Sequence, residues 1–224
     1  MSFLKIKNVY KCDKKNVIFG NFDLDLSLNQ IVTIVGPRKS GKTTLLNIIA
    51  GMDNNYHGDI IINNHLLDYN TRNITAYCPN TIIFNKNLKI KNILKIQSDL
   101  FLDFNYLKAV DFLAKNSIDI NKKLSYYNSQ IQYFIQLIII LNRDVKLYLL
   151  DNIFTNIIDI NLLYQIIDLL IEKSKSSLVI LTCASYEYTI NYSSLFVFIE
   201  YGKLYSVVSK NDLLDNINNV GGDY

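Results

Sequence analysis

The sequence predicts an α/β fold, a mainly parallel sheet with helices on both faces. First, short β-branched and aliphatic segments alternate with segments of helical periodicity. Second, residues 31–35, 146–150 and 178–182 are apolar nearly throughout, as expected of strands that helices cover on both faces. Third, a loop with two glycines joins the first of these strands to a helix. In open α/β sheets, ligands bind at this edge, where the strands end.

Length and composition indicate a globular protein, and we predict that residues 1–224 form one domain with a large core. Half of the residues are apolar and only 19% are charged, which excludes a disordered chain. Cys12, Cys78 and Cys183 are isolated, so neither a disulfide framework nor a zinc site is expected. The net charge of +3, without a long basic run, gives no reason to expect a nucleic-acid partner.

No segment of the sequence predicts a membrane span or a secretion signal. The longest unbroken apolar run, residues 137–141, is far too short to cross a bilayer. Residues 1–7 alternate like a strand and lack the apolar centre of a signal peptide. We therefore expect a cytoplasmic protein that reaches the inner face of a membrane only through a partner.

The first third of the chain predicts an antiparallel β subdomain. Residues 4–9 and 22–28 have the pattern of strands, and the second alternates apolar with polar residues as half-buried antiparallel strands do. A hairpin that turns at an Asn-Asn pair is expected within residues 58–67. Another short strand is expected at residues 74–77.

The middle of the chain predicts a helical lobe. Helical periodicity covers residues 88–116, and a long helix is expected at residues 129–141. The helical stretch is too long for a single crossover between two parallel strands. We therefore predict a separate lobe at approximately residues 81–145.

After the lobe, helices and strands alternate again. An amphipathic helix at residues 162–170 precedes the strand at 178–182, and a further strand follows at 195–199. Ser209 is positioned to cap a short final helix that runs through Leu214.

The loop after residues 31–35 fits the pattern G-x-x-x-x-G-K-[ST], and the helical segment that follows ends at Gly51. Strand, glycine loop and helix together are typical of a phosphate-binding loop, in which backbone N–H groups and the helix N-terminus face an anion. The alternative is an ordinary glycine-rich turn, and the surrounding strand and helix argue against it. The residues expected to bind nucleotide are Gly36, Pro37, Arg38, Lys39, Ser40, Gly41, Lys42, Thr43 and Thr44.

Three side chains have predicted roles of their own at this loop. We expect Lys42 to reach the β- and γ-phosphates of a nucleoside triphosphate and the Thr43 hydroxyl to ligate Mg²⁺. Asp151 ends the strand at residues 146–150, and its carboxylate is expected to hold the same Mg²⁺ through water. The alternative for Asp151 is a strand-end residue that caps the next segment, and the presence of the loop favours the metal role.

Several segments, in the same order along nearly the whole chain, resemble the ATP-binding cassette (ABC) family, the nucleotide-binding subunits of ABC transporters. The segment that begins with the loop resembles G-P-x-G-x-G-K-S-T-L-L-x-x-I-A-G, with Lys39 where a third glycine is usual. The other matching segments are residues 58–63 (G-E-I-x-I-x-G), 76–80 (Y-V-P-Q), 88–94 (L-T-V-x-E-N-L), 151–156 (D-E-P-F-S-N) and 180–185 (I-L-T-T-H-D). The resemblance implies an ABC-type P-loop NTPase core with an antiparallel β subdomain and an inserted helical lobe, and it implies ATP and Mg²⁺ as ligands.

At most positions that this family uses for hydrolysis, the chain has a different residue. The resemblance puts Asn152 in the place of the general base Glu, and an amide cannot take a proton from water. It puts Ala184 in the place of the switch His, and Asn80 in the place of a Gln that ligates Mg²⁺. The family's L-S-G-G-Q signature corresponds to residues 124–128 or, counted back from the metal-binding aspartate, to residues 127–131, and neither segment contains a glycine.

Two further family positions also differ. Asp13 stands where an aromatic ring usually stacks on adenine, and the nearby Tyr10 is expected to be an ordinary packed side chain. Asp159 lies one position out of register with the family's D-loop Asp.

The pattern indicates that residues for binding ATP are kept while residues for hydrolysis are replaced. The chain is rich in Asn, Ile, Lys and Tyr, so compositional drift and functional loss both remain open. We predict an ATP-binding subunit of an ABC transporter that docks on an integral membrane permease and pairs with a different, competent ATPase subunit. ATP binding would close this heterodimer, with hydrolysis at this chain's own site weak or absent. The alternatives are a non-transport ABC-type assembly or interaction module and, ranked last, a competent homodimeric ATPase.

Overall fold

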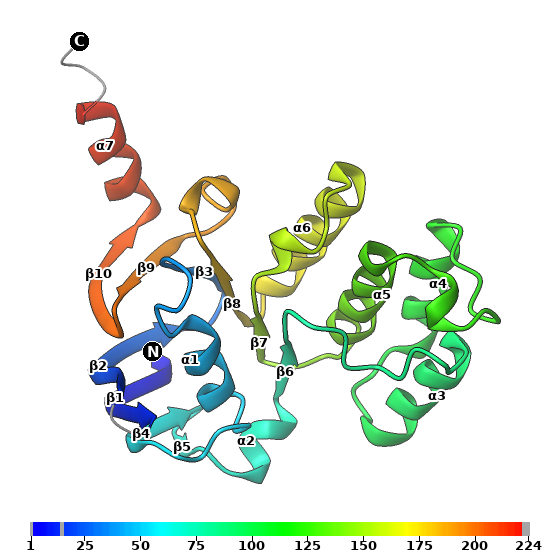
Figure 1. The fold of residues 1–224 in the computed structure, drawn as a ribbon, viewed down its shortest axis with the longest axis horizontal. Coiled ribbons are helices and arrows are strands. Elements are labelled where there is room, and N and C mark those ends of the chain that lie inside the picture. Colours follow the sequence, from blue (N-terminus) through cyan, green and yellow to red (C-terminus); the bar gives the residue numbers. More distant parts are fainter. Residues whose placement is uncertain (1, 14–15, 221–224) are drawn as a thin grey trace.

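The computed structural model describes residues 2–13 and 16–220, and its larger sheet has six strands in the order β10-β9-β3-β8-β7-β6 (Figure 1). Neighbouring strands are parallel except at the β10 edge, where β10 runs antiparallel to β9. The strands are β3 (Gln30–Val35), β6 (Thr75–Cys78), β7 (Leu147–Leu150), β8 (Leu178–Cys183), β9 (Leu195–Glu200) and β10 (Lys203–Ser209). The three apolar strands of the prediction are thus β3, β8 and β7, three consecutive neighbours.

A second, antiparallel sheet has the strand order β2-β1-β4-β5. Its strands are β1 (Ser2–Asp13), β2 (Asn16–Ser27), β4 (His57–Ile62) and β5 (His65–Leu66). The predicted hairpin turns where expected, because Asn63 and Asn64 both have positive φ angles, 52° and 64°. Positive φ at both central residues is the geometry of the two-residue turn that suits the twist of paired strands. The antiparallel β subdomain is therefore confirmed.

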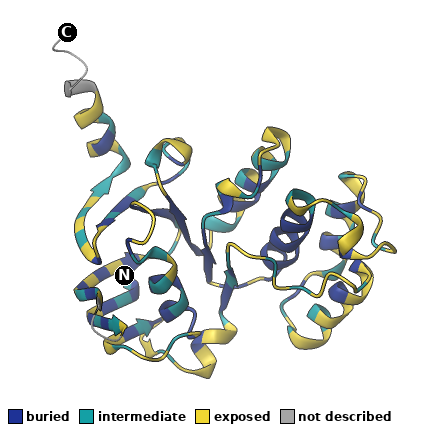
Figure 2. Ribbon diagram, viewed as in Figure 1, coloured by how far each residue is buried: buried dark blue, intermediate teal, exposed yellow. Residues whose placement is uncertain are grey.

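Each face of the larger sheet has its own apolar core. Alternate residues of β3, β7 and β8 pack on one side with α1 (Lys42–Ile49) and the antiparallel sheet. The remaining residues of the same strands pack on the other side with α5 (Ser129–Leu141) and α6 (Ile160–Ser174). Figure 2 shows these central strands and α5 as almost continuously buried. This arrangement confirms the prediction of helices on both faces, and it explains why the strands are apolar throughout.

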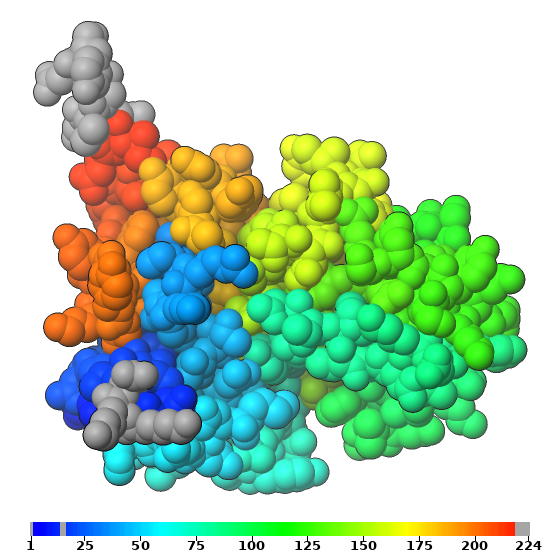
Figure 3. Space-filling view, in the orientation of Figure 1, coloured from blue at the N-terminus to red at the C-terminus, as the bar shows by residue number. Residues whose placement is uncertain are grey.

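The helical lobe consists of α3 (Ile90–Leu100), α4 (Tyr106–Lys115) and α5, which lie together on one side of the molecule (Figures 1 and 3). The helical pattern expected over residues 88–116 corresponds to two helices, α3 and α4. Asn105 begins the second helix, since its side-chain oxygen accepts a hydrogen bond from the Lys108 backbone N–H at 2.9 Å. The long predicted helix is α5, with the predicted bounds of 129–141.

The two remaining helices are α2 (Tyr69–Asn73) and α7 (Lys210–Val220). The Ser209 hydroxyl accepts a hydrogen bond from the Asp212 backbone N–H at 3.2 Å, so Ser209 caps α7 as predicted, although α7 continues beyond Leu214. Within residues 2–13 and 16–220, no helix combines the length and the apolar character needed to cross a bilayer.

Candidate functional site

The phosphate-loop motif connects β3 to α1, at the edge where the parallel strands end. Gly41, with φ of 101°, precedes the first residue of α1, and an L-residue with a side chain would be strained in that conformation. At Gly36, an added Cβ would overlap the carbonyl oxygen of Ile199 on the neighbouring strand β9. Both glycines of the motif are therefore required by the backbone path of the loop.

The Lys42 side chain folds back over this loop. Its Nζ donates hydrogen bonds to the carbonyl oxygens of Gly36 at 2.5 Å and Pro37 at 2.8 Å. Burial lowers the pKa of the Lys42 ammonium, while the nearby Cys183 and Asp151 act in the opposite direction. An anion placed in the loop would further favour the charged form. The ammonium is thus held where it can contact a phosphate group bound by the loop.

Thr43 and Asp151, which are 108 residues apart in the sequence, meet in the structure. The Thr43 hydroxyl donates a hydrogen bond to Asp151 Oδ2 at 2.8 Å. Asp151 is only 1% exposed and forms no ion pair among the residues that the structure describes. A buried carboxylate is unfavourable without a compensating charge. Thr43 and Asp151 thus lie in contact at the sheet edge, while their role as metal ligands stays a prediction.

The other oxygen of the Asp151 carboxylate contacts a residue to which the sequence assigned no role. The Thr182 hydroxyl, at the end of β8, donates to Asp151 Oδ1 at 2.6 Å. The same hydroxyl oxygen accepts a hydrogen bond from the Asn152 backbone N–H at 2.9 Å. The contact follows from the parallel pairing of β7 with β8, which brings the ends of the two strands together.

Asn152, Ala184 and Asn80 occupy the positions at which the ABC family has residues for hydrolysis, and their side chains make few contacts at this site. Asn152 follows Asp151 and adopts a left-handed backbone conformation, with φ of 52° and ψ of 45°. Ala184 follows β8 and is exposed. Asn80 is also exposed, and no hydrogen bond joins its side chain to Thr43 or Asp151, all three being described residues; its carbonyl oxygen accepts from Asn156 Nδ2 at 3.0 Å. The expectation that Asn80 ligates a metal therefore stays a prediction.

Both candidate signature segments lie at the N-terminal end of α5. Residues Leu124–Tyr126 form a 3-10 turn, and the Asn128 side chain caps α5 by accepting from the Ile131 backbone N–H at 2.9 Å. Tyr126 is largely exposed at this end of the lobe. Asp159, the residue next to the family's D-loop position, caps α6, because its carboxylate accepts hydrogen bonds from two backbone N–H groups at the start of that helix.

Tyr10 belongs to the antiparallel sheet and packs as predicted. Its ring lies 6.3 Å from that of His57 on the adjacent strand β4, and its hydroxyl contacts Cys12 Sγ at 2.7 Å. Asp13 is exposed at the end of β1.

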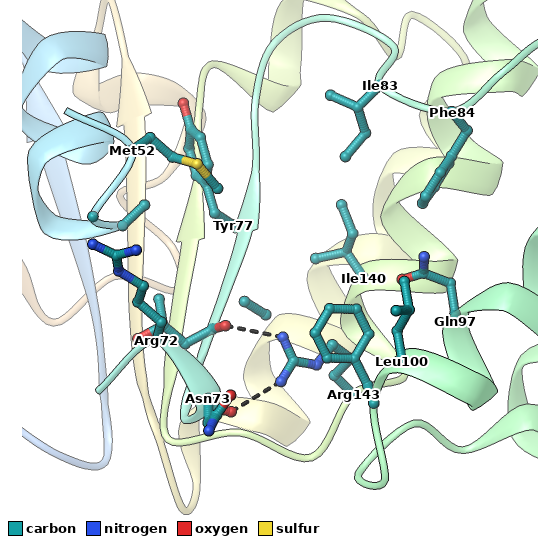
Figure 4. A pocket seen from close by; sticks show the side chains of 15 residues that line it. Met52, Arg72, Asn73, Tyr77, Ile83, Phe84, Gln97, Leu100, Ile140 and Arg143 are labelled. Atoms are coloured by element: carbon teal, nitrogen blue, oxygen red, sulfur yellow. Dashed lines mark hydrogen bonds between the residues drawn. The ribbon is translucent and has the colours of Figure 1, made fainter. Parts of the chain in front are cut away.

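A pocket of about 390 Å³ lies between the helical lobe and the part of the molecule that contains α1, α2 and β6 (Figure 4). One wall is formed by the end of α1, α2 and β6, with Met52, Arg72 and Tyr77. The opposite wall comes from α3 and α5, and includes Leu100. The Tyr77 hydroxyl donates to the Asn47 side chain on α1 at 2.8 Å, so one residue of this pocket contacts the helix that begins at the phosphate loop.

The residues at the sheet edge fit a magnesium-bound nucleotide. The loop offers glycine backbone and an ammonium to phosphates, which are the groups that phosphate loops use. A threonine hydroxyl and a carboxylate are hard oxygen donors of the kind that Mg²⁺ prefers. The buried Asp151 carboxylate, which forms no salt bridge within residues 2–13 and 16–220, adds a negative charge that a cation would offset.

The parallel sheet, the loop around Lys42 and the adjacent Thr43–Asp151 pair define the class of protein as a P-loop NTPase fold. A sequence model of one family in this class, described as ABC transporter, matches residues 19–155. This match covers more than half of the chain, so the chain belongs to the ABC transporter family.

Known proteins agree with this assignment. The chain is 31% identical over 126 residues to the putative ABC transporter ATP-binding protein MG065 of Mycoplasma genitalium, a match that covers 51% of this chain and 27% of that protein. It is 30% identical over 128 residues to the cytochrome c biogenesis ATP-binding export protein CcmA of Reclinomonas americana, covering 54% and 58% of the two chains. The chain thus spans less than two thirds of the length of either relative.

The fold also matches solved structures. An ATP-binding subunit of an ABC transporter superposes with a TM-score of 0.86 over 96% of this chain and 93% of that chain, at 16% sequence identity. At this identity the likeness establishes the fold, which is that of an ABC ATPase cassette.

Proposed function

We propose that this chain is an ATP-binding subunit of an ABC transporter that binds MgATP between its phosphate loop and Asp151. The observation that carries the proposal is the cluster of Lys42, Thr43 and Asp151 at one edge of the parallel sheet. Lys42 would contact the phosphates, and Thr43 with Asp151 would hold Mg²⁺, directly or through water. The metal would neutralise phosphate charge, while the loop orients the nucleotide.

Equilibrium binding of ATP in the presence of Mg²⁺ tests this proposal. Lys42→Ala is expected to weaken binding by at least about tenfold, because it removes a charge-assisted contact worth about 1.5–3 kcal/mol. Lys91→Ala, which removes an exposed lysine of the helical lobe, is the matched control and should bind like the wild type. Equal binding by the wild type and Lys42→Ala would show that the loop does not hold the phosphates.

We further propose that the bound ATP is hydrolysed slowly or not at all by this chain alone. The amide of Asn152 cannot act as a general base, a role worth about 10²–10⁴-fold in rate. Ala184 has no group that could contact the γ-phosphate, and the segments at the start of α5 contain no glycine to approach a partner's nucleotide closely. Binding without turnover would make ATP a ligand that closes a dimer.

The assay is phosphate release by the purified chain, with Lys42→Ala as the control for contaminating ATPases. We expect turnover near background, also in Asn152→Glu combined with Ala184→His, because a homodimer would still lack the signature glycines. Activity should appear when a competent second ABC subunit is added. Turnover of about one per second, in the usual range for enzymes, that vanishes in Lys42→Ala would contradict the proposal.

The pocket between the lobe and the sheet supports docking on an integral membrane permease. Met52 and Leu100 are 71% and 65% exposed, and they face the same pocket from opposite sides. A helix from a cytoplasmic loop of the permease would bury such residues in a groove of this kind. This docking would place the chain on the inner face of the membrane.

Recovery of the tagged protein from detergent-solubilised membranes tests docking. An integral membrane protein should co-purify with the wild type and be lost with Leu100→Glu, which puts a charge into the pocket. Leu102→Glu is the matched control, since Leu102 is fully exposed on the same lobe but does not line the pocket. If only soluble proteins co-purify, the function would instead be that of a nucleotide-dependent assembly or interaction module.

A further inference from the structure

The hydroxyl of Thr182 both accepts and donates a hydrogen bond. The Asn152 backbone N–H can only donate, so the Thr182 oxygen must accept from it, at 2.9 Å. The single hydroxyl proton is then free for Asp151 Oδ1, at 2.6 Å. The direction of both hydrogen bonds follows from this one donor.

Thr182 and Thr43 hold the same carboxylate in different surroundings. Thr182 is completely buried, whereas Thr43 is an exposed residue at the start of α1. The contact from Thr43 to Oδ2 can therefore exchange with water or with a bound ligand, while the contact from Thr182 to Oδ1 cannot. The backbone N–H of Asp151, bonded to the Cys78 carbonyl at 2.9 Å, anchors the main chain at the same point.

We propose that Thr182 is a positioning residue for the metal site: it holds Asp151 Oδ1 so that Oδ2 remains directed at Thr43 and at the Mg²⁺ of a bound nucleotide. This inference rests on the proposed function, because it concerns the same MgATP. Residues that orient metal ligands through hydrogen bonds typically change metal affinity by about 10–100-fold when they are replaced.

The test measures how the affinity for a fluorescent ATP analogue depends on the free Mg²⁺ concentration, and repeats the measurement in EDTA. Thr182→Val should raise, by about tenfold or more, the free Mg²⁺ concentration at which the gain in affinity for the ATP analogue is half complete. Binding in EDTA should not change, because the loop and Lys42 are untouched. Thr182→Ser, which keeps the hydroxyl, should restore the Mg²⁺ dependence of the wild type.

The chain offers a matched control for the loss of a buried threonine hydroxyl. Thr33 on the adjacent strand β3 is also completely buried, and its hydroxyl shares a 2.7 Å hydrogen bond with Ser193 rather than with the site. Thr33→Val should lower the melting temperature about as much as Thr182→Val and leave the Mg²⁺ dependence unchanged. If Thr182→Val does not fold, Thr182→Ala replaces it, since alanine puts no methyl group against the carboxylate.

The outcomes separate the inference from the proposed function. An unchanged Mg²⁺ dependence in Thr182→Val, or an equal loss of binding with and without Mg²⁺, would overturn the positioning role while MgATP binding stands. Absence of nucleotide binding by the wild type at every Mg²⁺ concentration would overturn both.

Discussion

Arg143 joins the helical lobe to the sheet, and its replacement should be among the costlier single changes in this protein. Its guanidinium forms two hydrogen bonds with the Asp103 carboxylate, at 3.1 and 2.9 Å. It also donates to the carbonyl oxygens of Thr75 at 3.0 Å and Asn73 at 2.9 Å, as drawn in Figure 4. Its charged end lies 3.9 Å from the centre of the Phe101 ring.

The magnitude follows from what Arg143→Ala leaves behind. Breaking a buried ion pair by removing one partner costs about 3–5 kcal/mol. The Arg143 side chain is 8% exposed, but that of Asp103 is 27% exposed, so water recovers part of the loss. The Thr75 carbonyl stays buried without its donor, which costs a further 1–3 kcal/mol or so. We therefore expect the free energy of unfolding to fall by about 3–4 kcal/mol.

Urea denaturation of the wild type and the variant measures this difference. Arg143→Lys keeps the positive charge but loses the planar guanidinium, so the free energy of unfolding should fall less than in Arg143→Ala. Lys115→Ala is the control, because it removes an exposed Lys115–Asp111 pair worth at most about 0.5 kcal/mol. A loss below about 1 kcal/mol in Arg143→Ala would refute the view that this residue carries the contact between lobe and sheet.

Two further predictions concern other parts of the molecule. Lys39 has a φ angle of 67°, a left-handed conformation that is strained for a residue with a side chain, at a position where the family usually has glycine. Lys39→Gly should therefore raise the free energy of unfolding by about 0.5–1 kcal/mol, after subtraction of the entropy cost of glycine. A decrease measured by urea denaturation would contradict this prediction. The hydrogen bond from Lys11 lowers the pKa of the Asp53 carboxyl in the folded protein. The contribution of this pair to the free energy of unfolding is therefore fully present above the pKa of Asp in the unfolded chain, about 3.9, and is lost as the pH falls through the lower pKa of the folded protein. Asp53→Asn should therefore reduce the acid dependence of unfolding measured between about pH 2 and 6, and an unchanged slope would count against the pair.

Much of the fold could be predicted because its signals are local. The strands next to the phosphate loop are short apolar runs, and the α5 bounds were predictable from an apolar helix that follows a polar segment. The break between α3 and α4 could not be predicted, because apolar residues continue across it at helical spacing. At that break the Phe101 ring packs against the guanidinium of Arg143, a residue far away in the sequence.

In the candidate site, too, one contact could be predicted from the sequence and another could not. The Thr43–Asp151 contact follows from a known strand–loop–helix pattern and was predictable across 108 residues. The contact of Thr182 with Asp151 depends on which residues pair between β7 and β8, with Leu150 opposite Leu181. A buried threonine at the end of an apolar strand also has an ordinary structural explanation, so sequence alone gave no reason to select it.

Compositional drift and functional loss can now be weighed position by position. The chain contains only 8 glycines in 224 residues, about half of the usual share. Of the nine described non-glycine residues with positive φ, six are asparagines: Asn8, Asn21, Asn29, Asn63, Asn64 and Asn152.

Asparagine thus takes left-handed positions throughout this chain, and Asn152 conforms to that use, since Asn tolerates this conformation better than Glu. Ala184 has no such explanation. Alanine occurs at only five positions in the chain, so the same bias would remove alanine rather than introduce it. The absence of an imidazole at 184 therefore supports a relaxed requirement for hydrolysis more strongly than the amide at 152 does.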